Sequence, residues 1–166
     1  MANAGIPAFS LEQKRQWMER CIELAYTAPG GIGKPHVGAV VVSREGVVLG
    51  EGYRSLLQGT RRLQRHAERM ALDAAGVRTR GATLVTTLEP CVRIRRGQLF
   101  KSCSELIAEN GIERVIYGLS ERNPVHDLSG KGIRYLQRAG VFLEQYPDLN
   151  SIICERLQPK GTSDEK

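Results

Sequence analysis

Five short apolar runs recur along the 166-residue chain, and the segments between them constrain the fold more than any other feature. The runs are residues 37–42, 47–53, 82–88, 114–118 and 141–143. A tight Arg44-Glu45-Gly46 turn joins the first two runs, which predicts an antiparallel hairpin. Segments of helical character separate the last three, which predicts parallel strands joined by right-handed crossovers. The predicted fold class is therefore α/β: a three-layer α/β/α arrangement around a mixed five-stranded sheet.

Capping signals and apolar spacing predict the helices around these strands. The first helix is expected to begin at Ser10, which forms a capping box with Gln13, and to end near Thr27 or Ala28. One face of this helix is predicted to be buried, because apolar residues recur there at helical spacing: Leu11, Trp17, Met18, Cys21, Leu24 and Ala25. The other predicted helices are residues 66–75, 102–109, 133–138 and 147–157. Cys21 and Cys154 fall on amphipathic helices, so both are expected to pack in the core.

The composition is that of one globular domain. Hydrophobic residues make up 41% and charged residues 25%, and no apolar run approaches the ~20 residues that span a bilayer. The N-terminal segment lacks a basic stretch followed by an apolar core, so we expect no secretory signal, and four reduced cysteines in a cytoplasmic protein. We expect a single domain over residues 1–157 and a flexible polar tail over 158–166.

Two short segments carry residues that indicate chemistry. His66-Ala67-Glu68 stands at the start of a predicted helix, and Cys91 follows the third predicted strand, with Cys103 twelve positions later. Taken singly, such a histidine is more often a cap and such a cysteine more often a small hydrophobic residue. Together, one imidazole and two thiolates suit Zn²⁺ and leave a fourth position for water, as in catalytic sites; a structural zinc is the alternative. Glu68 is placed to act on that water without binding the metal.

The order of these residues matches the zinc-deaminase signature H-x-E…P-C-x-x-C, in which the glutamate is the general acid and base. Here the eleven residues 92–102 separate the two cysteines, where the signature has two. Closing a loop of this length costs little free energy, so the ligand set can survive the insertion. We expect Pro90-Cys91 to open a helix, residues 92–102 to loop out, and Cys103 to enter that helix beside Cys91.

On these motifs the chain resembles the cytidine deaminase superfamily, and in particular the pyrimidine deaminase domain of riboflavin biosynthesis, which acts on a phosphorylated diaminopyrimidine. The resemblance covers residues 10–157. It extends to flanking segments at residues 34–40, 50–53, 81–84, 87–91, 111–112, 114–115, 123–124, 130–132 and 139–141. It implies a cytidine-deaminase-like fold, zinc as the cofactor held by His66, Cys91 and Cys103, and Glu68 as the proton shuttle. It also implies a homo-dimer or homo-tetramer.

The resemblance further suggests residues that contact substrate. Lys34 stands where the family has a substrate-holding asparagine before the first strand. Lys101 is the candidate for the basic residue that ends the family's cysteine loop. His36 abuts the first strand and either faces the base pocket or has a structural role. Asn123 lies on the loop after the fourth strand, where open α/β sheets form ligand crevices.

The net charge of +6 favours anionic partners, and arginines concentrate near the predicted metal ligands. Between the two cysteines lie Arg93, Arg95, Arg96 and Lys101, with no acidic residue. A solvated charged surface is the ordinary interpretation; the functional one is capture of phosphate, on a small substrate or along a nucleic acid. Proteins that bind single strands use aromatic stacking, and aromatic residues are only 5% of this chain. This favours a small phosphorylated pyrimidine.

The predicted function is zinc-dependent hydrolytic deamination of an amino-substituted pyrimidine, with release of ammonia. Two alternatives stay open. The first is a base deaminase acting on nucleic acid, either on cytosine of single-stranded DNA or on adenosine or cytidine of tRNA. The second is a non-catalytic binding module stabilised by zinc, against which Glu68 argues, because a structural zinc needs no such carboxylate.

Overall fold

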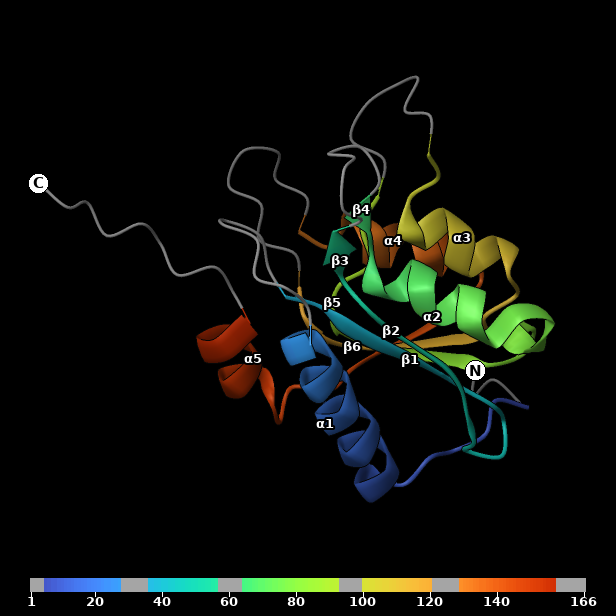
Figure 1. The fold of residues 1–166 in the computed structure, drawn as a ribbon. Coiled ribbons are helices and arrows are strands. Elements are labelled where there is room, and N and C mark those ends of the chain that lie inside the picture. Colours follow the sequence, from blue (N-terminus) through green and yellow to red (C-terminus); the bar gives the residue numbers. More distant parts are fainter. Residues whose placement is uncertain (1–4, 28–35, 57–63, 93–99, 121–128, 158–166) are drawn as a thin grey trace, which may run out of the picture.

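The computed structural model describes residues 5–27, 36–56, 64–92, 100–120 and 129–157. Within them a five-stranded sheet has the strand order β2-β1-β5-β6-β7 (Figure 1). The strands are β1 (Gly38–Val42), β2 (Val48–Tyr53), β5 (Thr83–Leu88), β6 (Arg114–Leu119) and β7 (Phe142–Gln145). β1 is antiparallel to both β2 and β5, whereas β5, β6 and β7 run parallel. The predicted mixed sheet, with its hairpin and three parallel strands, is confirmed.

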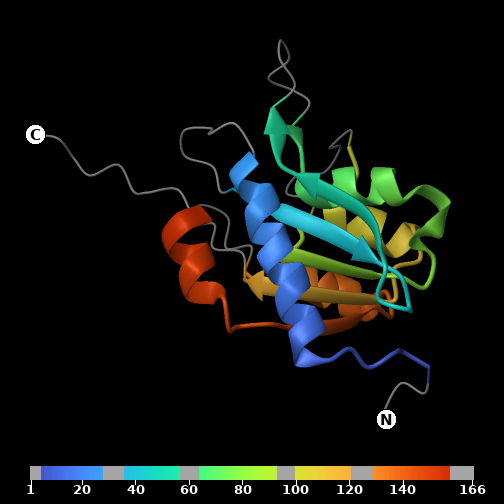
Figure 2. The same ribbon diagram turned by 60° about the horizontal axis from the view of Figure 1, so that its bottom comes forward.

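Helices cover both faces of the sheet, so the predicted three layers are confirmed as well. On one face lie α1 (Leu11–Thr27) and α5 (Asn150–Leu157) (Figures 1 and 2). On the other lie α2 (Ala67–Ala75), α3 (Cys103–Glu109) and α4 (Lys131–Arg138), and a 3₁₀ turn, η1 (Gly76–Thr79), follows α2. In the part of the chain that the structure describes, no helix combines the length and the apolar character needed to cross a bilayer.

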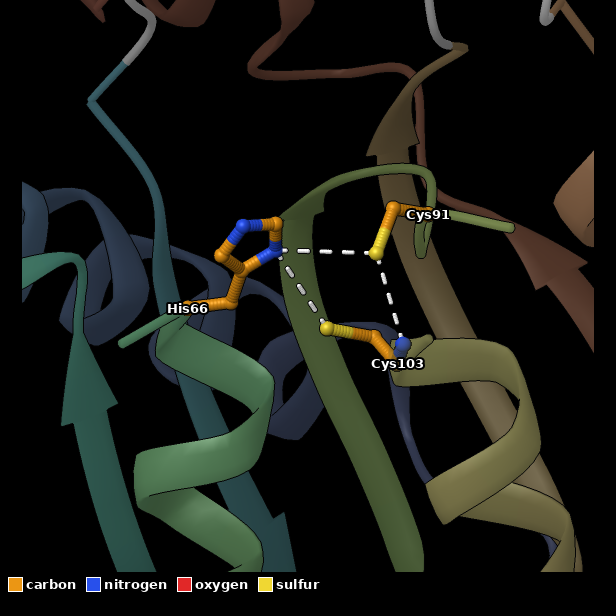
Figure 3. Close-up of side chains that lie close together, drawn as sticks. All are labelled: His66, Cys91 and Cys103. Carbon is orange, nitrogen blue, oxygen red and sulfur yellow. Dashed lines mark hydrogen bonds between the residues drawn. The ribbon is translucent and has the colours of Figure 1, made fainter. Parts of the chain in front are cut away.

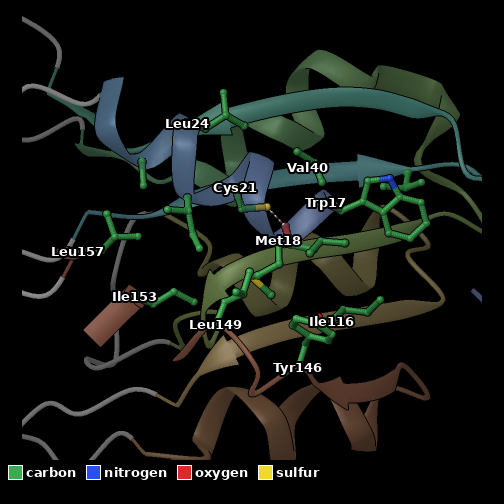
Figure 4. Packing of buried hydrophobic residues seen from close by; sticks show 14 of the residues in the cluster. Trp17, Met18, Cys21, Leu24, Val40, Ile116, Tyr146, Leu149, Ile153 and Leu157 are labelled. Carbon is green, nitrogen blue, oxygen red and sulfur yellow. Dashed lines mark hydrogen bonds between the residues drawn. The ribbon is translucent and has the colours of Figure 1, made fainter. Parts of the chain in front are cut away.

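Alternation along the central strands builds a separate core on each face. Val40 packs toward α1 and α5, while its neighbours Ala39 and Val41 pack toward α2. This is the period-2 orientation of side chains in a strand, applied to a strand that is buried on both faces. The α1 side is filled by large side chains such as Met18 and Ile153 (Figure 4).

Two predictions about helix faces are wrong. Leu11 is 73% exposed although it shares the predicted apolar stripe of α1, and it is Phe9, just before the helix, that packs on Trp17 in the core. Cys154 is exposed, since α5 turns its neighbour Ile153 into the core instead. Cys21 is buried, as predicted. The capping box that begins α1 is confirmed: the Gln13 N–H donates to Oγ of Ser10 (3.1 Å).

A second, two-stranded sheet was not predicted. β3 (Ser55–Leu56) pairs antiparallel with β4 (Gln64–Arg65) and leads the chain from β2 into α2 (Figure 1). Two residues per strand are too few to show a period in the sequence, so only the pairing itself reveals these strands.

Glycines in β2 let α2 lie directly on the sheet, and this contact sets the position of the N-terminus of α2. A Cβ at Gly52 would lie 2.1 Å from the carbonyl oxygen of Ala67 and 2.6 Å from the amide nitrogen of Ala71. A Cβ at Gly50 would lie 2.4 Å from the carbonyl oxygen of Ala71. Because backbone atoms of a helix cannot move aside individually, these two positions require glycine.

Replacing Gly52 with alanine is therefore expected to destabilise the protein. The added methyl overpacks the contact between β2 and α2, at a cost of about 1–3 kcal/mol in the free energy of unfolding. Urea unfolding followed by circular dichroism measures the change, and Val48→Thr, at a half-exposed position of the same strand, serves as the control. Equal stability of the Gly52→Ala protein and the parent would contradict the close contact.

Candidate metal centre

One imidazole and two thiols converge where β5 ends and where α2 and α3 begin (Figure 3). Nδ1 of His66 lies 3.6 Å from Sγ of Cys91 and 3.5 Å from Sγ of Cys103. The three atoms all lie within 4.8 Å of one another, and no other described residues form such a group of metal-binding side chains. The residues that the sequence singled out for a metal are thus brought together.

His66 occupies the N-cap of α2 without capping it. Its carbonyl accepts the first hydrogen bond of the helix, from the N–H of Met70 (3.1 Å), but its side chain makes no cap hydrogen bond. Serine, threonine, aspartate and asparagine are the side chains that stabilise this position. The imidazole instead points at the two sulfur atoms (Figure 3). The His66 side chain is therefore oriented as a metal ligand and does not cap α2.

The two cysteines reach the site differently from the prediction. Cys91 lies in the segment after β5 and opens no helix, whereas Cys103 is the first residue of α3. The insertion explains the difference, because after residues 92–102 the chain must begin its helix anew. The N–H of Cys103 donates to Sγ of Cys91 (3.3 Å), and the N–H of Ser104 donates to the carbonyl of Cys91 (3.1 Å). The start of α3 therefore lies against Cys91.

A capping box fixes where α3 begins. Oγ of Ser102 accepts from the N–H of Glu105 (3.3 Å), and the Glu105 carboxylate accepts from the N–H of Ser102 (2.8 Å). This box ensures that Cys103 stands in the first turn of the helix. The pattern Ser-x-x-Glu at residues 102–105 is the signal in the sequence that indicates this capping box.

Glu68 lies beside this cluster, in the first turn of α2. It is only 4% exposed, and its Oε2 accepts a contact from the Cys103 thiol at 3.6 Å. Burial raises the pKa of Glu68 to about 7. A carboxyl group with such a pKa, beside the three donor atoms, is able both to take and to give a proton near neutral pH.

The two thiols differ in acidity. Hydrogen bonds from Cys103 and from His66 lower the pKa of Cys91 well below that of an ordinary thiol, which favours its thiolate form. The same contact with Cys91, together with burial, raises the pKa of Cys103 far above that of an ordinary thiol. The first proton is thus lost more readily than the second, and a bound cation favours loss of both.

The separations of the His66 nitrogen from the two sulfur atoms fit zinc. Bonds of about 2.3 Å to sulfur and about 2.0–2.1 Å to nitrogen, at the tetrahedral angle, place a sulfur and a nitrogen ligand about 3.6 Å apart. The two observed separations between His66 and the cysteines are 3.6 and 3.5 Å. Three protein donors of the His/Cys/Cys kind also leave the fourth tetrahedral position for a reactant.

The predicted substrate residues are not placed together by the described part of the chain. Lys34, Arg93, Arg95, Arg96 and Asn123 lie outside the described residues, as does the predicted tail at 158–166. Lys101 is described, and its ammonium forms an ion pair with Glu109 (2.6 Å). His36 is half-buried, and its backbone N–H donates to the carbonyl of Leu157 (2.8 Å). Substrate roles for all of these remain predictions.

Two residues that support the site were not predicted from the sequence. Arg69, on α2, donates to the carbonyl of Lys101 (2.7 Å) and so holds the end of the insertion near α2. Ser104 is fully buried, and its hydroxyl donates to the carbonyl of Pro90 (3.2 Å). Neither contact follows any local spacing in the sequence, since the partners are 32 and 14 residues apart.

Comparison with known families matches residues 11–119 to the cytidine and deoxycytidylate deaminase zinc-binding region. The chain belongs to this family. The match spans the whole cluster and Glu68, and the family's zinc agrees with the donor set found in the structure.

Relatives within the family include proteins of riboflavin biosynthesis. The chain is 40% identical over 137 residues to the riboflavin biosynthesis protein RibD of Aquifex aeolicus, which covers 82% of this chain and 32% of that protein. It is 37% identical over 157 residues to RibD of Escherichia coli, covering 88% of this chain and 39% of that protein. The chain thus spans about a third of the length of these relatives. The diaminohydroxyphosphoribosylamino-pyrimidine deaminase of Buchnera aphidicola is 36% identical over 133 residues, with 77% of this chain and 80% of that protein covered.

Solved structures agree with this family. RibD of Acinetobacter baumannii superimposes with a TM-score of 0.70 at 30% identity, covering 88% of this chain and 38% of that one. The deoxycytidylate deaminase of cyanophage S-TIM5, at 24% identity, matches in fold with a TM-score of 0.65 over 83% of this chain and all of that one. The predicted cytidine-deaminase-like fold is confirmed.

Replacing Cys103 with serine is expected to abolish stable zinc binding, because a hydroxyl is a far poorer zinc ligand than a thiolate. The loss should exceed the roughly 10–100-fold drop in affinity that changes outside the ligand set cause. Metal analysis of purified protein measures it, with Cys154→Ser, the same change at an exposed cysteine, as the control. Equal zinc content in the two variants would remove Cys103 from the ligand set.

Proposed function

We propose that this chain catalyses the hydrolytic deamination of a phosphorylated diaminopyrimidine, with His66, Cys91 and Cys103 as zinc ligands and Glu68 as the proton shuttle. The observation that supports it best is the position of a buried carboxylate, Oε2 of Glu68, 3.6 Å from a sulfur of the three-donor cluster. Zinc held by these three residues would lower the pKa of a water molecule toward neutrality and so supply the nucleophile.

Glu68 carries two protons in sequence. Its Oε2 first accepts a proton from the attacking water, whose oxygen bonds to the amino-bearing carbon. Glu68 passes this proton to the ring nitrogen beside that carbon. It then moves the second water proton to the amino group, and the carbon–nitrogen bond breaks. Ammonia leaves, and the ring keeps a carbonyl in place of the amine. Because Glu68 ends as it began, one carboxylate suffices for the cycle.

The surroundings of Glu68 and the cysteines favour this chemistry. Burial removes water that would compete for the carboxylate, and α2 carries both His66 and Glu68 at its N-terminus, so one rigid element sets their separation. A purely structural metal site would not need a buried carboxylate whose partner is a ligand sulfur. The non-catalytic alternative is therefore the weaker one.

The substrate is inferred from the relatives. The deaminase of Buchnera aphidicola is named for a diaminohydroxyphosphoribosylamino-pyrimidine and shares most of its length with this chain. A phosphoribosyl group also suits the arginines at 93, 95 and 96, whose charges would pair with phosphate. We extend the proposal to a cytoplasmic homo-dimer or homo-tetramer, which light scattering of the purified protein would test.

Glu68→Gln is expected to keep zinc and fold while ammonia release falls by about 10²–10⁴-fold, the usual contribution of a general acid and base. The amide has the shape of the carboxylate but cannot carry the proton. Coupled ammonia detection measures the rate, and metal analysis verifies the zinc. Glu155→Gln, at an exposed position of α5, is the matched control. Undiminished turnover by Glu68→Gln would refute the shuttle.

The double variant Arg95→Ala/Arg96→Ala is expected to lower kcat/KM for the phosphoribosyl substrate by roughly 10²- to 10⁴-fold. Each charge-assisted hydrogen bond to phosphate contributes about 1.5–3 kcal/mol. The dephosphorylated substrate should show no such difference between the variant and the parent. Arg80→Ala/Arg138→Ala, at exposed positions, makes the same change in net charge and is the control.

The same assay discriminates the substrate classes. Deamination of single-stranded DNA or tRNA, with binding that weakens steeply as salt rises, would replace the small pyrimidine by a nucleic acid. Release of ammonia from the phosphorylated diaminopyrimidine, and none from the oligonucleotides, is the expected result.

A further inference from the structure

Glu89 is a buried carboxylate outside the three-donor cluster and outside the proton relay. It follows β5 directly and is 1% exposed. Its Oε2 accepts from the N–H of Gly130 (3.0 Å), and its Oε1 accepts from the N–H groups of Gly132 (2.9 Å) and Ile133 (3.2 Å). The carboxylate therefore binds the N-terminus of α4, which has no cap from its own N-cap residue, Gly130.

These contacts form a cap supplied by a distant part of the chain. The first N–H groups of a helix have no partner within the helix, and a negative charge at this end is favourable. The first turn of α4, which begins at Lys131, contains no acidic residue that could supply this charge. A buried charge needs such partners, because an unpaired carboxylate in the core would be very costly. The N–H groups of α4 thus give the buried Glu89 carboxylate its hydrogen-bond partners, and the carboxylate caps the helix.

We propose that Glu89 is a positioning residue for the metal centre, which joins the end of β5 to α4 and thereby fixes Cys91. The inference rests on the proposed function, since it takes Cys91 as a zinc ligand. Only Pro90 separates the two residues, and proline limits the backbone between them. A displacement of the Glu89 backbone would therefore be passed on to Cys91.

The backbone at Pro90 and Cys91 is held from two sides. From α4, Gly132 lies so close that a Cβ there would be 2.0 Å from the carbonyl oxygen of Pro90. From α3, the hydroxyl and the N–H of Ser104 donate to the carbonyls of Pro90 and Cys91 (3.2 and 3.1 Å). Removing the bonds between the Glu89 carboxylate and α4 would leave the α3 contacts and the hydrogen bond from the Glu89 N–H to the carbonyl of Leu119 (2.8 Å).

Glu89→Gln tests this role, because the amide keeps the size of the side chain but turns a donor toward at least one backbone N–H. We expect zinc affinity to fall about tenfold, as for other residues that orient metal ligands. Competition with a chromophoric chelator measures the affinity in the full chain. We also expect the visible absorption bands of the Co²⁺-substituted protein to shift, since they report the geometry around the metal. A contribution to stability alone would move neither quantity.

Ser10→Ala is the matched control, because it removes a helix cap of α1 on the opposite face of the sheet. It should lower thermal stability while zinc affinity and the Co²⁺ spectrum stay those of the parent. Gly132→Ala provides a second route, since its methyl would lie 2.0 Å from the carbonyl oxygen of Pro90 and 3.2 Å from Oε1 of Glu89 and would displace this segment while the carboxylate keeps its charge. It decides the question if Glu89→Gln fails to fold. Parental zinc affinity and a parental Co²⁺ spectrum in Glu89→Gln and Gly132→Ala would overturn the proposal. If the parent itself binds neither metal, the proposed function fails instead.

Discussion

The requirement that an imidazole and two sulfur atoms meet at one point governs the organisation of this molecule. The donors come from three separate segments: the start of α2, the segment after β5, and the start of α3. No local structure holds them together, so the sheet has to do so. Glycines in β2 seat α2 close to the sheet, and β5, at the centre of the sheet, places Cys91 at the carboxyl end of the parallel strands β5, β6 and β7. Ligand crevices of open α/β sheets form at this end.

Several groups at this end of the sheet are individually unfavourable for folding. His66 replaces a capping residue, Glu68 and Cys103 are buried ionisable groups, and Cys91 lies where a thiolate needs partners. The compensation is nearby: Ser102 caps α3, and Glu89 caps α4 across the fold. The site residues thus depart from the usual rules for helix caps and buried charges, while neighbouring residues supply the missing caps and partners. Such a departure is typical of a functional site.

The sequence was sufficient for features that depend on repeated patterns or on chemical identity. Strand runs and their spacing predicted the mixed sheet, and the types of His66, Cys91, Cys103 and Glu68 predicted a metal site. Features that depend on contacts between distant segments could not be predicted from the sequence. The β3–β4 pair is too short for any period, the contact of Arg69 with Lys101 links unrelated segments, and exposure of Cys154 depends on which side of α5 meets the core. The break between Cys91 and α3 escaped prediction because a signature describes ligand order, and not the path of the chain.

Both ends of the insertion, residues 92–102, are anchored, so the geometry of the metal centre does not depend on the length of the insertion. At the Cys91 end, Glu89 and Ser104 hold the backbone; at the other end, Arg69 holds Lys101 and the Ser102 capping box fixes Cys103. The entropy of closing a loop rises only slowly with its length. With both ends fixed, residues between them can change in number and charge at little cost to the three donors. The chemistry of the centre and the proposed recognition of phosphate can therefore change independently within one fold.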